Sequence, residues 1–93
     1  MSTPGRYRKK PLVIEAIRYD GDNVNAVCDQ LVEWNAQYVV RGDPAASPVL
    51  VIGTLEGEMT VPVGGYVLRG TAGEVYPCRG DIFEATYERV FEG

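Results

Sequence analysis

The chain of 93 residues contains no histidine and only two cysteines, Cys28 and Cys78. Without histidine, one chain cannot form a Ser-His-Asp triad, a Cys-His nucleophile pair or a histidine-ligated zinc site. Two thiols that stand fifty residues apart also fall short of the four ligands of a thiolate zinc site. We therefore expect no metal, no cofactor and no catalytic residues.

Long apolar runs are also missing, because no stretch approaches the roughly 18 residues that a membrane span requires. The basic start followed by an apolar stretch invites comparison with a signal peptide, but Glu15 and Arg18 interrupt that stretch and no small-residue cleavage site follows. The glycine-bearing segments GTLEGE and VGGYVLRG lack the lysine and the strand-to-helix context of a phosphate-binding loop. We predict a cytosolic protein that does not contact membranes and keeps both cysteines as reduced thiols.

Charge is distributed unevenly along the chain. Its net charge is -4, yet four of the nine basic residues lie at positions 6, 8, 9 and 10, which leaves five basic against thirteen acidic residues over 11–93, a net of -8. An acidic body repels a phosphate backbone, so general nucleic-acid binding is not expected. We predict a basic N-terminal arm over residues 1–10 and a single α+β domain over residues 11–93.

The first half of that domain predicts a strand, a helix and a second strand. Residues 11–19 are β-branched and apolar on both faces, which is typical of a strand placed centrally in a sheet. Asp22 is the expected N-cap of an amphipathic helix that ends near Asn35 and presents Val24, Val27, Cys28 and Leu31 on its apolar side. Residues 36–40 follow as the second strand.

The second half predicts a meander, since three glycine-containing turns connect short apolar segments. A tight hairpin is expected around Glu56-Gly57, followed by strands over residues 66–69 and 74–77, each pairing with its sequence neighbour. Asp81 and Glu84 have capping-box spacing, which predicts one helical turn that starts at Asp81. Residues 85–91 fit either strand alternation or one helical face, and the strand formers among them favour a strand.

These elements predict one antiparallel sheet of about five or six strands with one main helix on one face. Several strands are apolar on both faces, and one helix covers only one of them. A monomer would therefore leave an apolar face in water, so we expect a two-fold homodimer.

The tripeptide Arg-Gly-Asp occurs twice, at residues 41–43 and 79–81, both times next to a strand end. Glycine and aspartate are ordinary turn residues, and we interpret both copies as turns. Cys78 stands before the second copy and before a predicted helix N-terminus, where the helix dipole and Arg79 would stabilise a thiolate. Neither a general base nor a second cysteine lies near it in sequence.

Three segments carry a resemblance. Residues 7–11 read YRKKP and are soon followed by VIEAI, the middle contains TLEGEMTV, and Tyr76-Pro77-Cys78 precedes DIFEATYE. The chain resembles a family of small bacteriophage and prophage proteins over nearly its whole length, with residues 35–48 as the main exception. The family's Pro-Gly-Asp-Tyr turn is replaced here by Val63, Gly64, Gly65 and Tyr66. The resemblance implies an origin in a phage or prophage and no particular activity.

We hypothesise a non-catalytic binding protein that acts on a host protein in the host cytoplasm, in host takeover or anti-defence. Tyrosine and tryptophan dominate binding hot spots. The aromatic candidates are Tyr7, Trp34, Tyr38, Tyr66 and Tyr76.

Two other functions stay open. In one, an oligomer sequesters a small anionic ligand such as a nucleotide signal, with Arg41, Arg69 and Arg79 supplying charge and the tyrosines stacking on bases. In the other, the chain is a hydrolase or transferase that uses the carboxylates Glu15, Asp20 and Asp22.

Overall fold

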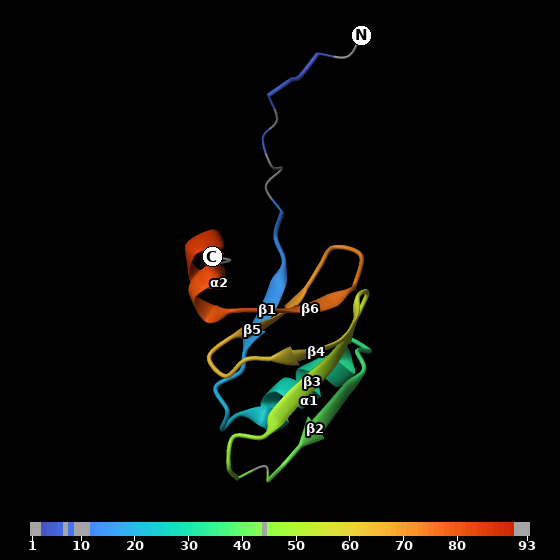
Figure 1. Cartoon of the computed structure of the whole chain (residues 1–93), viewed down its shortest axis with the longest axis vertical. Helices are drawn as coiled ribbons and strands as arrows, with labels where there is room; N and C mark the ends of the chain where they lie inside the picture. Colours follow the sequence, from blue (N-terminus) through green and yellow to red (C-terminus); the bar gives the residue numbers. More distant parts are fainter. Residues whose placement is uncertain (1–2, 7, 9–11, 44, 91–93) are drawn as a thin grey trace.

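The computed structural model describes residues 3–6, 8, 12–43 and 45–90, which form an α+β fold with one main helix, as predicted (Figure 1). Within these residues, six strands form two antiparallel three-stranded sheets. Sheet 1 has the order β1 (Glu15–Arg18), β5 (Tyr66–Arg69), β6 (Val75–Cys78), and sheet 2 has the order β2 (Tyr38–Arg41), β3 (Val49–Thr54), β4 (Gly57–Val61). The helices are α1 (Val24–Glu33) and α2 (Gly80–Thr86).

The chain changes sheets after β4, and this is where the predicted single meander is wrong. Pro62 has no N–H to continue the hydrogen-bonded ladder of β3 and β4. The turn that follows Pro62 is hydrogen-bonded to Tyr19, the residue after β1. Gly64 N–H donates to the Tyr19 carbonyl at 2.6 Å, and Tyr19 N–H donates to the Gly65 carbonyl at 2.8 Å. As a result β5 pairs with β1 instead of β4, while the predicted pairings of β3 with β4 and of β5 with β6 do form.

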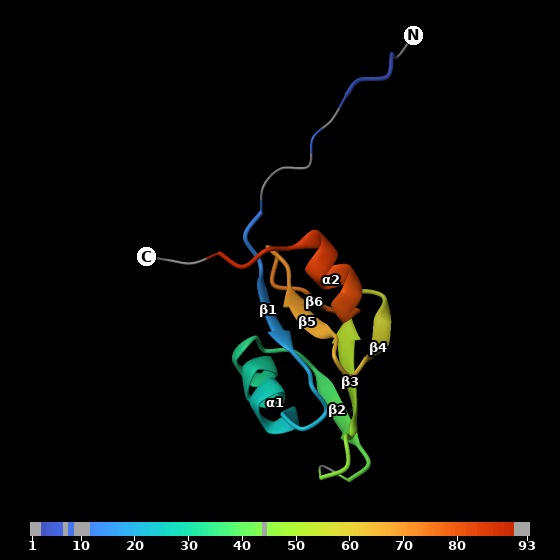
Figure 2. The same cartoon turned by 90° about the vertical axis from the view of Figure 1, so that its left-hand side faces the viewer.

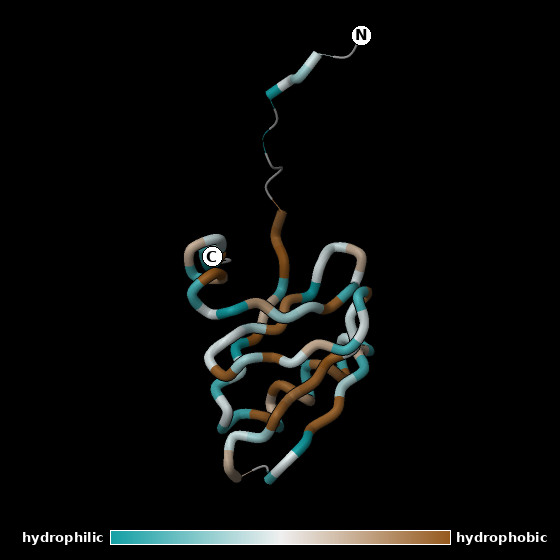
Figure 3. The backbone as a smooth tube through the Cα atoms, in the orientation of Figure 1, coloured by the Kyte–Doolittle hydropathy of each residue, from teal (hydrophilic) through white to brown (hydrophobic). Residues whose placement is uncertain are grey.

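The first predicted strand is shorter than expected and lies elsewhere in the sheet. β1 begins at Glu15 and forms an edge of sheet 1, so β5 is the central strand. Leu12 and Val13 precede it with 56% and 74% of their surfaces exposed. Figure 3 shows this apolar stretch as a brown segment that leads into β1 from beyond the sheet. Pro11 lies outside the described residues.

The core fills the space between α1 and the inner faces of the two sheets (Figure 2). The helix contributes the predicted Val24, Val27 and Leu31, and Cys28 packs against the core half-buried. Its N-cap is Asn23 rather than the predicted Asp22. The Asn23 side chain accepts from the Asp20 N–H and donates to the Arg18 carbonyl, both at 2.8 Å, and so fastens the turn between β1 and α1.

The helix ends at Glu33, and Asn35 follows with a φ of 55°, the left-handed conformation that often closes a helix. The expected hairpin forms between β3 and β4, with Gly57 at a φ of 102°. Among the described residues, neither helix has the length and apolar character needed to cross a bilayer.

The C-terminal segment is more helical than predicted. α2 runs from Gly80 to Thr86 with Arg79 at its N-cap, so Asp81 lies in the first turn and is not the cap. Its carboxylate instead pairs with the Arg79 guanidinium at 2.8 Å. The strand expected over residues 85–91 does not form in residues 87–90, and residue 91 lies outside the described part.

Tyr19 is fully buried, and its hydroxyl donates to the Pro48 carbonyl. We expect Tyr19→Phe to destabilise the fold by about 1–2 kcal/mol, because the buried carbonyl loses its partner. Urea unfolding measures this change, with Tyr66→Phe as the matched control, because the Tyr66 hydroxyl forms no hydrogen bond with the described residues. Equal losses in the two variants would contradict the prediction.

Candidate functional site

The side of sheet 1 that faces away from the core is built from alternate residues of its strands. On β5 these are Tyr66 and Leu68, which lie opposite Cys78 and Tyr76 of β6. Leu68 is fully buried although it does not belong to the main core. Figures 1 and 2 show α2 beside this outer face. The outer side of sheet 1 therefore contains a buried leucine outside the main core, on the side where α2 lies.

Three stacked rings hold α2 to the sheet. The Tyr66 and Phe83 rings have centroids 3.8 Å apart at 21°, and the Phe83 and Tyr87 rings follow at 5.0 Å and 27°. Tyr76 joins these rings through a hydrogen bond with Tyr87. Burial is the main cause of a raised pKa at Tyr76, and the charge of Tyr87 and this hydrogen bond raise it further. The structure thus brings together two predicted aromatic candidates, Tyr66 and Tyr76, with two that the hypothesis did not include. The four-residue spacing of Phe83 and Tyr87 on a helix was the signal for them.

A groove of about 440 Å³ opens beside this stack. One wall is the segment that leads into β1, the other is the segment after α2, and Tyr66 and Phe83 lie between them. Much of its lining is apolar and open to solvent, since Leu12, Val13 and Val90 are 56%, 74% and 61% exposed. The residues that line the groove are Leu12, Val13, Ile14, Ala16, Tyr66, Phe83, Tyr87, Glu88, Arg89 and Val90.

The other predicted aromatic residues lie away from this groove. Trp34 is 9% exposed and belongs to the core. Tyr38 is on the core-facing side of sheet 2, where its hydroxyl is hydrogen-bonded to the Cys28 thiol. Tyr7 lies outside the described residues.

The three predicted arginines do not meet. Arg41 ends β2 in sheet 2, whereas Arg69 and Arg79 lie at opposite ends of the β5–β6 hairpin. Arg69 pairs with Glu15 at 3.2 Å, and Arg79 pairs with Asp81. No two of them form a common anion site with the tyrosines in one chain, among the residues that the structure describes.

The predicted carboxylates are similarly dispersed. Glu15 is held by Arg69, and Asp20 pairs with Arg18 at 2.7 Å. Asp22 is exposed in the turn before α1. No cluster of three or more metal-ligating side chains occurs within the described ranges.

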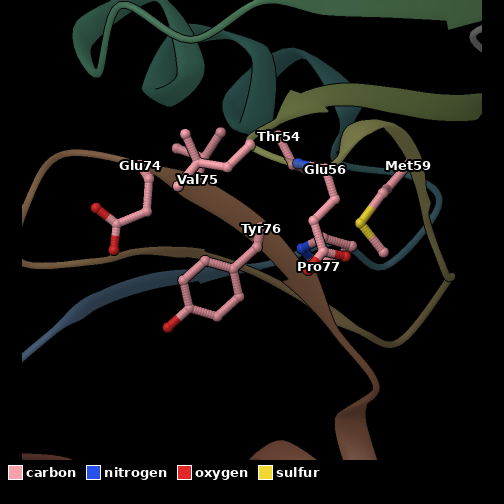
Figure 4. Close-up of a pocket in the computed structure, with 8 residues that line it drawn as sticks. Thr54, Glu56, Met59, Glu74, Val75, Tyr76 and Pro77 are labelled. Atoms are coloured by element: carbon pink, nitrogen blue, oxygen red, sulfur yellow. The ribbon is translucent and has the colours of Figure 1, made fainter.

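A second hollow, of about 300 Å³, lies between the β3–β4 hairpin and β6 (Figure 4). Figure 4 shows Glu74 and Tyr76 on one side of β6 and Val75 on the other. Its described lining includes Glu56 and Glu74 but no arginine or lysine, so its electrostatics disfavour an anion. The hollow is lined by Thr54, Leu55, Glu56, Met59, Glu74, Val75, Tyr76 and Pro77.

No family model, curated protein or solved structure matches the chain.

Both cysteines are free thiols, as predicted, but Cys78 is not the stabilised thiolate that its position before a helix suggested. Burial, followed by the charge of Asp81, raises the pKa of Cys78. The Arg79 guanidinium is paired with the Asp81 carboxylate. Burial is also the main cause of a raised pKa at Cys28.

The raised pKa predicts slow alkylation of Cys78. Below its folded pKa the thiol is protonated, so in a Cys28→Ala background at about pH 8 iodoacetamide should react more slowly with native than with urea-unfolded protein. Asp81→Asn should increase the native rate because it removes the nearby negative charge, whereas Glu84→Gln on the same helix serves as the control. Faster reaction of the native than of the unfolded thiol would show instead that Cys78 is activated.

Proposed function

We propose that this chain is a small phage-encoded, non-catalytic binding protein that acts on a host protein in the host cytoplasm. Its contact with that protein is the groove between residues 12–16 and 87–90. The phage origin is supported by the YRKKP, TLEGEMTV and YPC…DIFEATYE segments.

The single observation that carries the proposal is the exposed apolar lining of the groove. Leu12, Val13 and Val90 lie on its two walls, around the Tyr66–Phe83 stack. Isolated exposed apolar side chains are normal on a protein surface, but a contiguous group beside aromatic rings is typical of an interaction site. Such a group would bury apolar area around aromatic anchors on docking.

The charges near the groove indicate what would bind there. Glu88 and Arg89 line the groove. Asp81 and Glu84 are exposed on α2, and the body as a whole is acidic. A segment with apolar side chains and flanking basic residues would complement this surface. The proposed partner is therefore a host protein that offers such a segment.

A non-catalytic role is supported by the state of the carboxylates. Glu15 and Asp20 are engaged in ion pairs, and neither lines the groove. Sequestration of an anionic ligand has no comparable support, because Arg69 and Arg79 are paired with carboxylates and lie apart from Arg41.

Capture from host lysate by the immobilised protein tests the proposal. A Val13→Glu variant should retain roughly a tenth or less of the host protein that the wild type enriches, because a charge is placed in the apolar contact. Leu55→Glu is the matched control: Leu55 is 87% exposed, lies on the β3–β4 hairpin and does not line the groove. Thermal melts should confirm that both variants fold.

Enrichment of one host protein by the wild type and by Leu55→Glu, with loss in Val13→Glu, supports the proposal. Equal capture by all three, or no enriched host protein at all, would contradict it.

A further inference from the structure

The side of sheet 2 that faces away from the core carries a patch of valines. Strand register places Val39, Val51 and Thr60 in one row across β2, β3 and β4, and Arg41 beside Val49 in the next row. A third row, on the opposite side of the first row from Arg41 and Val49, pairs Gly53 of β3 with Glu58 of β4. We call Val39, Val49, Val51, Thr60, Arg41 and Glu58 the valine face.

The valine face is open within the described part of the chain. Figures 1 and 2 show α1 on the opposite side of sheet 2, and no described helix lies over this side. Val39 and Val49 are 46% and 48% exposed, whereas Val51 between them is 8% exposed. The open face of an antiparallel sheet usually carries polar side chains, yet here β2 and β3 present valines side by side.

The two charges of the face occupy opposite corners. Arg41 ends β2 at one edge of the sheet, and Glu58 lies near the start of β4 at the other edge and the other end. With strands about 4.8 Å apart and about 3.3 Å per residue, the corners are roughly 16 Å apart with Val51 between them. Neither charge forms an ion pair with any described residue.

This arrangement is self-complementary. Consider two such faces stacked on each other, with a two-fold axis that runs between them and passes above Val51. When this axis is at right angles to the line from Arg41 to Glu58, each arginine lies opposite the other copy's glutamate. The valines then meet around the axis, and the strands of the two sheets cross steeply, as in orthogonal sheet packing. We propose that two copies of this chain associate through their valine faces.

The size of the face sets the strength of the association. Three strands span only about 10 Å and the rows about 13 Å, which is below the standard size of stable interfaces. We therefore expect a reversible dimer, with a dissociation constant of roughly tens to hundreds of micromolar. The valine face and the groove lie on different sheets, so this inference does not rest on the proposed function.

Charge exchange tests the pairing of Arg41 with Glu58 directly. Arg41→Glu gives a face with two negative corners, and Glu58→Arg gives a face with two positive corners. Each variant alone should dimerise roughly tenfold or more weakly than the wild type, because like charges then meet twice. An equimolar mixture of the two should form a heterodimer, and the double variant should regain the homodimer.

Sedimentation equilibrium from about 10 µM to about 1 mM, at low salt, measures these states. Glu33→Arg, a charge reversal on α1 at the opposite side of sheet 2, should leave the dimer unchanged, and circular dichroism should show that every variant is folded. A wild type that stays monomeric over this range would overturn the proposal and leave the face to a different partner. A dimer that is insensitive to all charge exchanges would also overturn it.

Discussion

The division of the structure into two sheets depends on the backbone of one residue, Tyr19. Its N–H and carbonyl are hydrogen-bonded to the turn at Gly64 and Gly65, and its hydroxyl is bonded to Pro48 at the start of β3. These bonds join the end of β1 to the beginning of β3 and to the chain between β4 and β5. Once they form, β5 is aligned with β1, β6 follows it, and the core is enclosed between two sheets instead of beneath one.

Close packing around the same turn explains why glycine is required at positions 65 and 80. A Cβ at position 65 would lie 2.7 Å from Pro62 Cγ and 2.8 Å from the Cys78 carbonyl oxygen, and a Cβ at Gly80 would clash with the Gly64 carbonyl. Gly80 of the second Arg-Gly-Asp is thus required for close packing against the 62–65 turn. The packing around Gly65 leaves no room for any side chain at that position.

Local patterns in the sequence were sufficient for the elements that depend on neighbours along the chain. The apolar spacing of Val24, Val27 and Leu31 located the face of α1, and Glu56-Gly57 located the hairpin. The pairing of β5 with β1 joins residues about fifty positions apart, and no local pattern encodes it. For the C-terminal segment, the aromatic spacing fitted both helix and strand, and the outcome was decided by stacking of Phe83 on Tyr66.

The candidate site was predictable only in part, for a similar reason. Residue type alone selected Tyr66 and Tyr76, which do meet, but it also selected Trp34, which the core needs. For the arginines, the sequence could not indicate that Arg69 would form an ion pair with Glu15 on the neighbouring strand, or that Arg79 would form one with Asp81. An arginine in such an ion pair is less available to a ligand. The register of β1 and β5 sets the pair of Arg69 with Glu15, and the first turn of α2 sets that of Arg79 with Asp81.

The two outer faces follow from the limited helical content of the chain. Each sheet has one face in the shared core, which α1 completes, and so each has a second face to cover. The outer side of sheet 1 meets the short helix α2 through the stacked rings of Tyr66 and Phe83, and a groove lies beside this contact. Sheet 2 has no remaining helix, and Val39 and Val49 stay exposed among the described residues. Both proposed contacts therefore involve the outer sides of the sheets, where the charges around each surface would select a partner of complementary charge.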